Sequence, residues 1–306
     1  MKIAVMATGG VGGYFGARLA AGGEDVHFIA RGRHLDAIRE RGLRVESANG
    51  DLRVHPARAT DKPGDVGAVD IVIFAVKLWD TEAAGALCKP LLGPDTAVVS
   101  FMNGVDSEDR LIPLLGRDHV MGGVAYIAST IAEPGVIKHT GSMARIAFGE
   151  LDGKRSARGE RFLAACVAAG IEAKLSDNIV RDLWGKFALL ASFSGVTCLT
   201  RKPMGPIRAE PVTRELLVES VREVIALSAA KRVDLGADFL EKQKAVMANM
   251  PAEMKSSMLV DLERGNRLEL NWLSGAVARM GDEAKVATPI HHFIQTALKL
   301  YEMGAR

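Results

Sequence analysis

A glycine-rich turn directly after the first apolar segment constrains the fold of this chain more than any other feature. Residues 2–6 lead into Ala7-Thr8-Gly9-Gly10-Val11-Gly12, and a helical pattern follows over 13–21. A helix N-terminus carries positive potential and unpaired backbone N–H groups, so a glycine turn that opens a helix can hold a phosphate group. Residues 2–21 are therefore predicted to form a strand, a phosphate-binding turn and a helix.

The turn resembles the dinucleotide-binding fingerprint G-x-G-x-x-G, with Gly9 and Gly12 at its second and third glycines. Ala7 takes the first glycine position and restricts the tight turn, and the extra Gly10 is the candidate for relieving that restriction. The alternative is a turn that only packs a strand on a helix, but the strand before it and the helix after it favour a cofactor site. The predicted cofactor contacts in the turn are Ala7, Thr8, Gly9, Gly10, Val11 and Gly12.

The first half of the chain alternates apolar runs with helical patterns. The sequence predicts strands over 3–6, 26–29, 69–76, 97–101 and 120–127, and helices over 13–21, 34–41 and 81–92. Continuous apolar strands separated by helices indicate a parallel, doubly wound α/β sheet that is covered on both faces. Residues 43–46 and 52–54, around Asn49-Gly50, are predicted to form an inserted hairpin.

The second half is different, because helical periodicity dominates from Asn178 onward and proline and glycine breakers divide it into several helices. The predicted organisation is therefore a Rossmann-type domain over residues 1–176 followed by an all-α domain over residues 177–306.

Composition excludes several classes of protein. The 39 basic residues nearly balance the 37 acidic ones, and a net charge of +2 gives no support for nucleic-acid binding. The three cysteines (Cys88, Cys166 and Cys198) lie far apart among apolar neighbours, which predicts buried thiols and a reducing compartment. There is no pattern of a signal peptide, and polar residues interrupt the longest uncharged run, so we expect a cytoplasmic protein without a membrane span.

The second apolar segment favours one nicotinamide dinucleotide over the other. Folds that bind NAD usually carry Asp or Glu at the end of this strand, where the carboxylate holds the ribose hydroxyls. Here the segment ends in Ile29-Ala30-Arg31-Gly32-Arg33-His34, with two arginines and no acid. Guanidinium groups suit a 2′-phosphate. A solvated surface loop is the alternative, but the missing acid favours NADP.

A lone lysine interrupts an apolar helical segment in the second half. Lys186 is the only charged residue in 183–200, and it shares a helix face with Ile179, Leu183 and Leu190. Burial would lower the pKa of this lysine, as in lysines that act as acids or bases. Alternatively, the side chain reaches water along its aliphatic stem. The sequence pattern leaves both interpretations open.

Other polar residues of the second half are less distinctive. Glu269 lies among apolar neighbours at the start of a helical pattern that runs to about Met280, which suggests partial burial. Ser256 and Ser257 begin another helical pattern, where serines commonly cap the helix. No cluster has the spacing of metal ligands, and the pair His291-His292 is predicted to lie on a helix surface.

Together, several separated motifs resemble the ketopantoate reductase family (2-dehydropantoate 2-reductases) over nearly the whole chain. The motifs are the glycine turn with Gly13-Tyr14-Phe15-Gly16, Arg31, Val76-Lys77, Asn103-Gly104, Trp184-Gly185-Lys186, Ser256-Ser257-Met258-Leu259-Val260-Asp261 and Glu269. Each is weak alone, but in this order and spacing they are specific. The resemblance implies a Rossmann-type domain followed by an all-α domain similar to the C-terminal domain of 6-phosphogluconate dehydrogenase.

The resemblance also implies roles for residues of the reaction site. Lys186 matches the family's catalytic lysine, the general acid that protonates the ketone oxygen. Glu269 matches the acid that binds the substrate hydroxyl and helps to place the lysine. Asn103 matches an asparagine near the nicotinamide and the substrate, and Ser257 matches a serine that contacts the substrate carboxylate.

The remaining matches are cofactor contacts, Lys77 and Arg31, with Arg31 at the 2′-phosphate. The implied activity is the NADPH-dependent reduction of ketopantoate to pantoate, a step of pantothenate biosynthesis. The implied partner is a small 2-oxo acid, and an apolar-rich helical domain is compatible with a homodimer.

Three positions depart from the family pattern. Leu190, Ser194 and Met254 stand where family members often have asparagines, and losing amide donors is a strong influence on substrate choice. Reduction of another 2-oxo acid or related carbonyl is therefore the alternative function. A third hypothesis is a non-catalytic NADP(H)-sensing regulator, against which the retained Lys186 and Glu269 argue.

Overall fold

The computed structural model describes residues 1–305, and the chain divides into two compact units, Met1–Asp182 and Leu183–Arg306. The strands are β1 (Lys2–Met6), β2 (Asp25–Ile29), β3 (Leu43–Glu46), β4 (Leu52–Val54), β5 (Arg58–Thr60), β6 (Ile71–Phe74), β7 (Ala97–Ser100), β8 (Val120–Glu133), β9 (Val136–Glu150) and β10 (Glu172–Leu175). The helices are α1 (Gly10–Ala21), α2 (Gly32–Arg41), α3 (Thr81–Leu87), α4 (Ser107–Leu115), α5 (Ala157–Ala168), α6 (Ile179–Thr200), α7 (Met204–Ala209), α8 (Pro211–Ala230), α9 (Phe239–Asn249), α10 (Ser257–Glu263), α11 (Ser274–Ala284) and α12 (Pro289–Leu298). Short 3-10 helices are η1 (Pro63–Asp65), η2 (Leu78–Asp80), η3 (Lys89–Leu91), η4 (Arg117–His119), η5 (Leu270–Trp272) and η6 (Lys299–Tyr301).

The boundary between the two units, Asp182/Leu183, falls at the end of the first turn of α6. The predicted boundary between residues 176 and 177 lies just before that helix.

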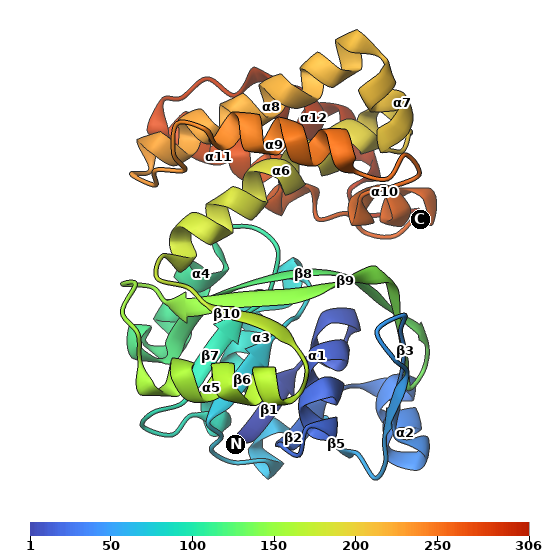
Figure 1. The fold of residues 1–306 in the computed structure, drawn as a ribbon, viewed down its shortest axis with the longest axis vertical. Coiled ribbons are helices and arrows are strands. Elements are labelled where there is room, and N and C mark those ends of the chain that lie inside the picture. Colours follow the sequence, from blue (N-terminus) through green and yellow to red (C-terminus); the bar gives the residue numbers. More distant parts are fainter. Residues whose placement is uncertain (306) are drawn as a thin grey trace. The chain divides into compact units, whose positions relative to one another are not determined.

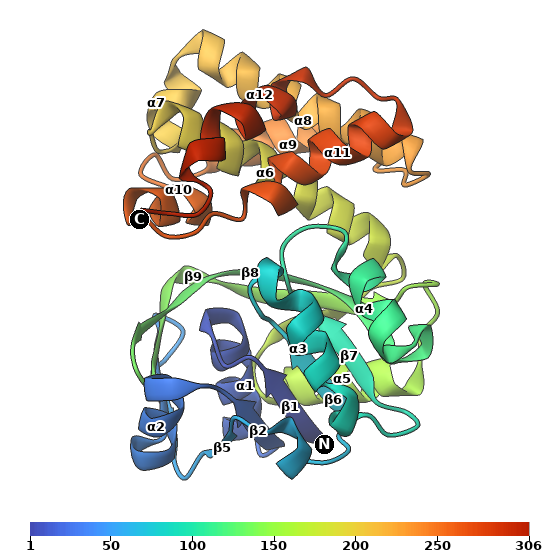
Figure 2. The ribbon, with the colours of Figure 1, turned by 180° about the vertical axis from the view of Figure 1, so that it is seen from behind.

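A sheet of ten strands forms the centre of the first unit, with α5 on one face (Figure 1) and α3 on the other (Figure 2). The strand order is β4-β3-β9-β8-β7-β6-β1-β2-β5, and β10 pairs with β9. The strands β2, β1, β6 and β7 are parallel neighbours, and every residue of β6 and β7 is buried. Helical elements follow in the second unit, so the predicted Rossmann-type sheet with a helical domain after it is confirmed.

The sheet is mixed, because an antiparallel pair of strands that the sequence does not predict joins the predicted parallel strands. β8 and β9 pair in antiparallel fashion from Met121↔Glu150 to Glu133↔Val136 and form a long hairpin (Figure 1). The hairpin turns at Pro134-Gly135, where Gly135 has a φ of +83°. The sequence predicts only 120–127 as a strand, because Ser129 and Thr130 interrupt the apolar run while the backbone ladder continues. The predicted hairpin of β3 and β4 is confirmed.

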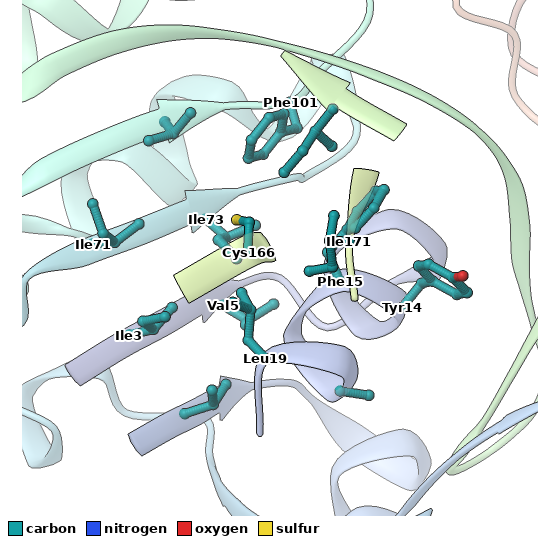
Figure 3. Close-up of a cluster of buried hydrophobic side chains, with 14 of the residues drawn as sticks. Ile3, Val5, Tyr14, Phe15, Leu19, Ile71, Ile73, Phe101, Cys166 and Ile171 are labelled. Carbon is teal, nitrogen blue, oxygen red and sulfur yellow. The ribbon is translucent and has the colours of Figure 1, made fainter. Parts of the chain in front are cut away.

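Apolar side chains of β1, β6, α1 and α5 meet in the core of the first unit. Figure 3 labels Ile3, Val5, Tyr14, Phe15, Leu19, Ile71, Ile73, Phe101, Cys166 and Ile171 in this cluster. Truncating a fully buried aromatic such as Phe15 to alanine costs about 3–5 kcal/mol of folding stability. All three cysteines are buried, as predicted, and burial raises the pKa of each thiol to about 12.

The helix α6 supplies much of the interior of the second unit, including the fully buried Ala188 and Ala191. Among the described residues, α6 is the one helix that is long and apolar enough to cross a membrane by length and composition. However, 67% of its most apolar window is buried inside the protein, as expected for the core helix of a soluble protein.

The structure corrects the prediction for the histidine pair of α12. His291 is fully buried, with its ring nitrogens bonded to the Ser274 hydroxyl at 3.2 Å and the Ser220 carbonyl at 3.1 Å. Burial lowers the pKa of His291 to about 4. His292 is partly exposed and lies 3.1 Å from an Asp282 carboxylate oxygen. One histidine of the pair therefore lies in the core. Within residues 1–305, no group of three or more His, Cys, Asp or Glu side chains could hold a metal ion.

Candidate active site

Four candidate cofactor elements of the first unit follow the carboxyl ends of neighbouring parallel strands. The glycine turn follows β1, Arg31 follows β2, Lys77 follows β6 and Asn103 follows β7. Since β2, β1, β6 and β7 are adjacent and parallel, these segments share one edge of the sheet. β2 lies on one side of β1 and β6 lies on the other, so the strand order reverses at β1. In open α/β sheets, ligands bind at such a switch point.

The glycines of the turn serve different purposes. A Cβ at Gly12 would overlap the Ala7 carbonyl and lie 2.8 Å from Val5 Cγ1, so glycine is needed where α1 packs on β1. A Cβ at Gly9 would meet nothing within 4 Å, so the turn has open space beside its backbone. A Cβ at Gly10 would overlap the carbonyl of Ser129 in β8. Close packing against β8 therefore explains Gly10, and compensation for Ala7 is not needed to account for it.

Thr8 anchors the turn with all of its polar groups. Its backbone N–H and its hydroxyl both donate to the Ile29 carbonyl, at 2.9 and 3.0 Å. Its own carbonyl is bonded to His34 Nε2 at 2.8 Å. Thr8 is 2% exposed, so it fixes the position of the turn against β2 and α2.

The start of α2 presents positive charge to solvent. Arg31 and Arg33 are exposed, and the first turn of α2 contains no acidic residue. Gly32 between the arginines has a φ of +54°, a conformation that favours glycine. Together with the unpaired N–H groups of the first helical turn, the two guanidinium groups make this segment suited to an anion.

Lys77 and Asn103 occupy the next two loops along the edge. Lys77 is exposed, and its ammonium lies 5.5 Å from the centre of the Trp79 ring. Trp79 is not among the predicted site residues, although an aromatic ring two residues from a lysine can indicate a cation–π contact. Asn103 is partly buried and precedes Gly104, whose φ is +91°.

In the second unit the structure brings Lys186 and Glu269 together. Lys186 is partly buried on α6, and burial lowers its pKa to about 8, while the negative charge of Glu269 opposes that shift. Glu269 is 8% exposed, and its carbonyl accepts the N–H groups of Trp272 and Leu273 at 3.1 Å. The lowered pKa agrees with the first of the two interpretations left open for Lys186.

Ser256 and Ser257 have different surroundings at the start of α10. Ser256 Oγ accepts the N–H of Leu259 at 3.0 Å and lies 2.7 Å from the hydroxyl of Thr197 in α6. Ser256 therefore caps α10 and ties it to α6, as the position of these serines in the sequence suggested. Ser257 is the exposed first residue of α10.

The three departing positions differ in what they could offer a ligand. Leu190 is partly exposed on α6, one turn beyond Lys186, and presents only hydrocarbon. Ser194 is completely buried, so its hydroxyl is enclosed by protein. Met254 packs against an apolar cluster of α6, α7, α8 and α9. These three positions therefore expose no amide or hydroxyl group to a ligand.

Comparison with known proteins identifies the family. The model for ketopantoate reductase PanE/ApbA matches residues 3–153, and the model for its C-terminal part matches residues 178–302. The uncharacterized oxidoreductase YkpB of Bacillus subtilis is 30% identical over 99% of both chains. The chain belongs to the ketopantoate reductase family. Its fold and both halves of its sequence agree with that assignment, and the predicted resemblance is confirmed.

Named members of the ketopantoate reductase family lie at modest sequence distance. A 2-dehydropantoate 2-reductase of Mesorhizobium japonicum is 33% identical over 94% of this chain and 94% of its own length. The crystal structure of a 2-dehydropantoate 2-reductase from Geobacter metallireducens has a TM-score of 0.91 at 30% identity, covering 98% of this chain and 99% of that chain. The protein is therefore an oxidoreductase of this family.

Proposed function

We propose that this ketopantoate reductase family member reduces a small 2-oxo acid with NADPH, and that ketopantoate is the leading substrate. The observation that carries the proposal is the pair formed by Lys186 and Glu269 in the second unit. A lysine whose pKa is about 8 is mostly protonated at neutral pH, yet releases its proton more readily than an ordinary lysine. The named 2-dehydropantoate 2-reductases among the relatives support ketopantoate.

The sheet edge of the first unit fits a dinucleotide. Open space beside Gly9, together with the N–H groups of the first turn of α1, suits a pyrophosphate. Ala7 and Gly10 border the same turn, and Thr8 shapes it through the bonds described above. We assign the 2′-phosphate to Arg31, because its guanidinium is exposed beside an acid-free helix start.

The other two loops complete the proposed cofactor site. Lys77 lies in the loop that follows β6, and its exposed ammonium would suit the phosphates of the cofactor. Asn103 follows β7 and would orient the nicotinamide and the substrate through its amide.

Bound NADPH would supply the hydride that reaches the carbonyl carbon of the substrate. As negative charge develops on the carbonyl oxygen, the Lys186 ammonium stabilises it and donates a proton from Nζ. Glu269 accepts a hydrogen bond from the substrate hydroxyl and holds the lysine in place, and Ser257 contacts the substrate carboxylate. A positioned general acid of this kind contributes about 10²–10⁴-fold to the rate.

A second candidate substrate is a 2-oxo acid with an apolar side chain. It is favoured by Leu190, which offers hydrocarbon one turn from Lys186, and by the complete burial of Ser194. A substrate hydroxyl that finds no partner in such surroundings loses affinity, whereas a methyl or phenyl group gains it.

The deciding experiment is an assay of NADPH oxidation with ketopantoate and a matched panel of hydroxylated and apolar 2-oxo acids. We expect the highest kcat/KM for ketopantoate. Much higher activity on an apolar acid, with ketopantoate near background, would select the second candidate. A Leu190→Asn variant serves as the matched probe, since it should improve hydroxylated substrates relative to apolar ones.

A further inference from the structure

His34 joins three segments of the first unit that are far apart in sequence. It belongs to the first turn of α2, three residues after Arg31. Its Nε2 lies 2.8 Å from the Thr8 carbonyl in the glycine turn, and its Nδ1 accepts the N–H of Gly135, at the turn between β8 and β9, at 3.0 Å. The side chain is partly buried. One imidazole thus links the two loops assigned to the cofactor phosphates and braces both against the hairpin.

The two contacts fix the chemical state of the ring. Since Gly135 donates its N–H, Nδ1 must carry a lone pair. Since the Thr8 carbonyl can only accept, Nε2 must carry the hydrogen. The neutral Nε2–H tautomer satisfies both, and burial lowers the pKa of His34, which favours that neutral form.

Apart from the bond of His34, the hydrogen bonds between the glycine turn and this part of the chain end before α2 begins. The bonds from Thr8 to the Ile29 carbonyl end before Arg31, at the last residue of β2. The next residue, Ala30, donates its N–H at 3.1 Å to the carbonyl of Thr60, the last residue of β5, and not to the glycine turn. Gly32 follows, and an added Cβ there would meet nothing within 4 Å, so open space lies beside the backbone between Arg31 and His34.

We propose that His34 is a positioning residue that sets the spacing between the glycine turn and Arg31, and thereby the selectivity for NADPH over NADH. The inference rests on the proposed function, in which the turn holds the pyrophosphate and Arg31 the 2′-phosphate. Both cofactors share the pyrophosphate, so a change in this spacing penalises the one that must reach both anchors.

Three substitutions separate the two bonds of His34. His34→Gln can keep a donor near the Thr8 carbonyl, His34→Asn can keep an acceptor near the Gly135 N–H, and His34→Ala keeps neither. We expect Ala and Asn to raise the Kd of NADPH about tenfold, the effect of one well-placed hydrogen bond, with a much smaller change for NADH. Gln should retain most of the NADPH preference. At saturating NADPH, kcat should stay near the wild-type value in all three variants.

The matched control is His119→Ala, which removes another bond from a histidine to a backbone carbonyl, that of Thr96, which precedes β7. It should lower the melting temperature without changing the ratio of the two Kd values. If His34→Ala and His34→Asn leave that ratio unchanged while the wild type prefers NADPH, His34 has only a structural role and the inference fails. If His34→Asn rather than His34→Gln retained the NADPH preference, the inference would also fail, because the bond to Gly135 and not the bond to Thr8 would then set the preference. A wild type that does not prefer NADPH would refute the proposed cofactor itself.

Discussion

The candidate cofactor residues of the first unit and the candidate catalytic pair of the second unit are built in opposite ways. In the first unit, Arg31 and Lys77 are exposed on loops, beside a turn whose backbone is open at Gly9. In the second unit, Glu269 is buried, and burial lowers the pKa of Lys186. A multiply charged ligand needs accessible donors, whereas tuning an acid needs removal from water. Binding and proton transfer should therefore respond separately to substitution.

The largest effect should come from Lys186→Ala. Removing the general acid should lower kcat by about 10²–10⁴-fold, because the proposed proton donor to the carbonyl oxygen is then gone. The Kd of NADPH should change little, since the proposed phosphate contacts lie in the first unit. Steady-state kinetics and cofactor titration measure the two quantities. Lys242→Ala, at an exposed lysine of α9, is the control and should leave both unchanged.

Persistent turnover in Lys186→Ala would show that another group donates the proton. Loss of turnover together with loss of NADPH binding would also break the separation between the two units. A wild type that binds NADPH but turns over no carbonyl compound would instead support the NADP(H)-sensing hypothesis.

Acid should destabilise the second unit through His291. Its folded pKa of about 4 lies below the ordinary value of 6.5, so the unfolded chain binds a proton that the folded one excludes. The contribution of neutral His291 is complete above pH 6.5 and is lost as pH falls toward 4, by up to about 3 kcal/mol.

Tryptophan fluorescence can follow this loss, because Trp184 and Trp272 report on the second unit. His291→Gln should flatten the dependence of unfolding on pH between 6.5 and 4, even if the variant is less stable overall. The partly exposed neighbour His292 provides the control, and His292→Gln should keep the wild-type dependence. An unchanged dependence in His291→Gln would assign the acid sensitivity to other groups.

A smaller effect is expected from Arg31→Ala. Loss of a charged contact to the 2′-phosphate should raise the Kd of NADPH about 10–100-fold and that of NADH only slightly. The control Arg41→Ala, at an exposed arginine in the last turn of the same helix, should affect neither. Equal weakening of both cofactors by Arg31→Ala would mean that Arg31 does not contact the 2′-phosphate.

The parts of the site that sequence could predict are those in which neighbouring residues carry the signal. The glycine turn and the arginines after β2 are contiguous with the strands that position them, so the pattern alone locates them. The association of Lys186 with Glu269 depends on how α6 packs near η5, and no local pattern encodes it. Resemblance to the family supplied that pair.

Side-chain bonds to the backbone were the hardest features to predict. His34 bonds to the main-chain carbonyl of Thr8 and the main-chain N–H of Gly135. Almost any residue type has these groups, so the sequence does not show that these residues are the partners. The antiparallel partner of β8 was missed for a related reason, since ladder bonds continue where side chains become polar. His291 was misplaced because helical spacing alone does not say which face of α12 packs on α8 and α11.

The pH dependence of catalysis tests most directly whether Lys186 is the acid. We expect kcat/KM for reduction to be highest below pH 8 and to fall as pH rises through about 8, since the ammonium then loses its proton. In Glu269→Gln the fall should occur at lower pH, because the carboxylate that raises the pKa of Lys186 is gone.

The measurement is the pH–rate profile of the wild type and Glu269→Gln from pH 6 to 10, with the preferred 2-oxo acid and saturating NADPH. A fall near pH 8 that moves to lower pH in the variant is the expected result. A wild-type profile that stays flat across pH 8, or a fall that the variant leaves in place, would contradict the assignment of Lys186 and Glu269.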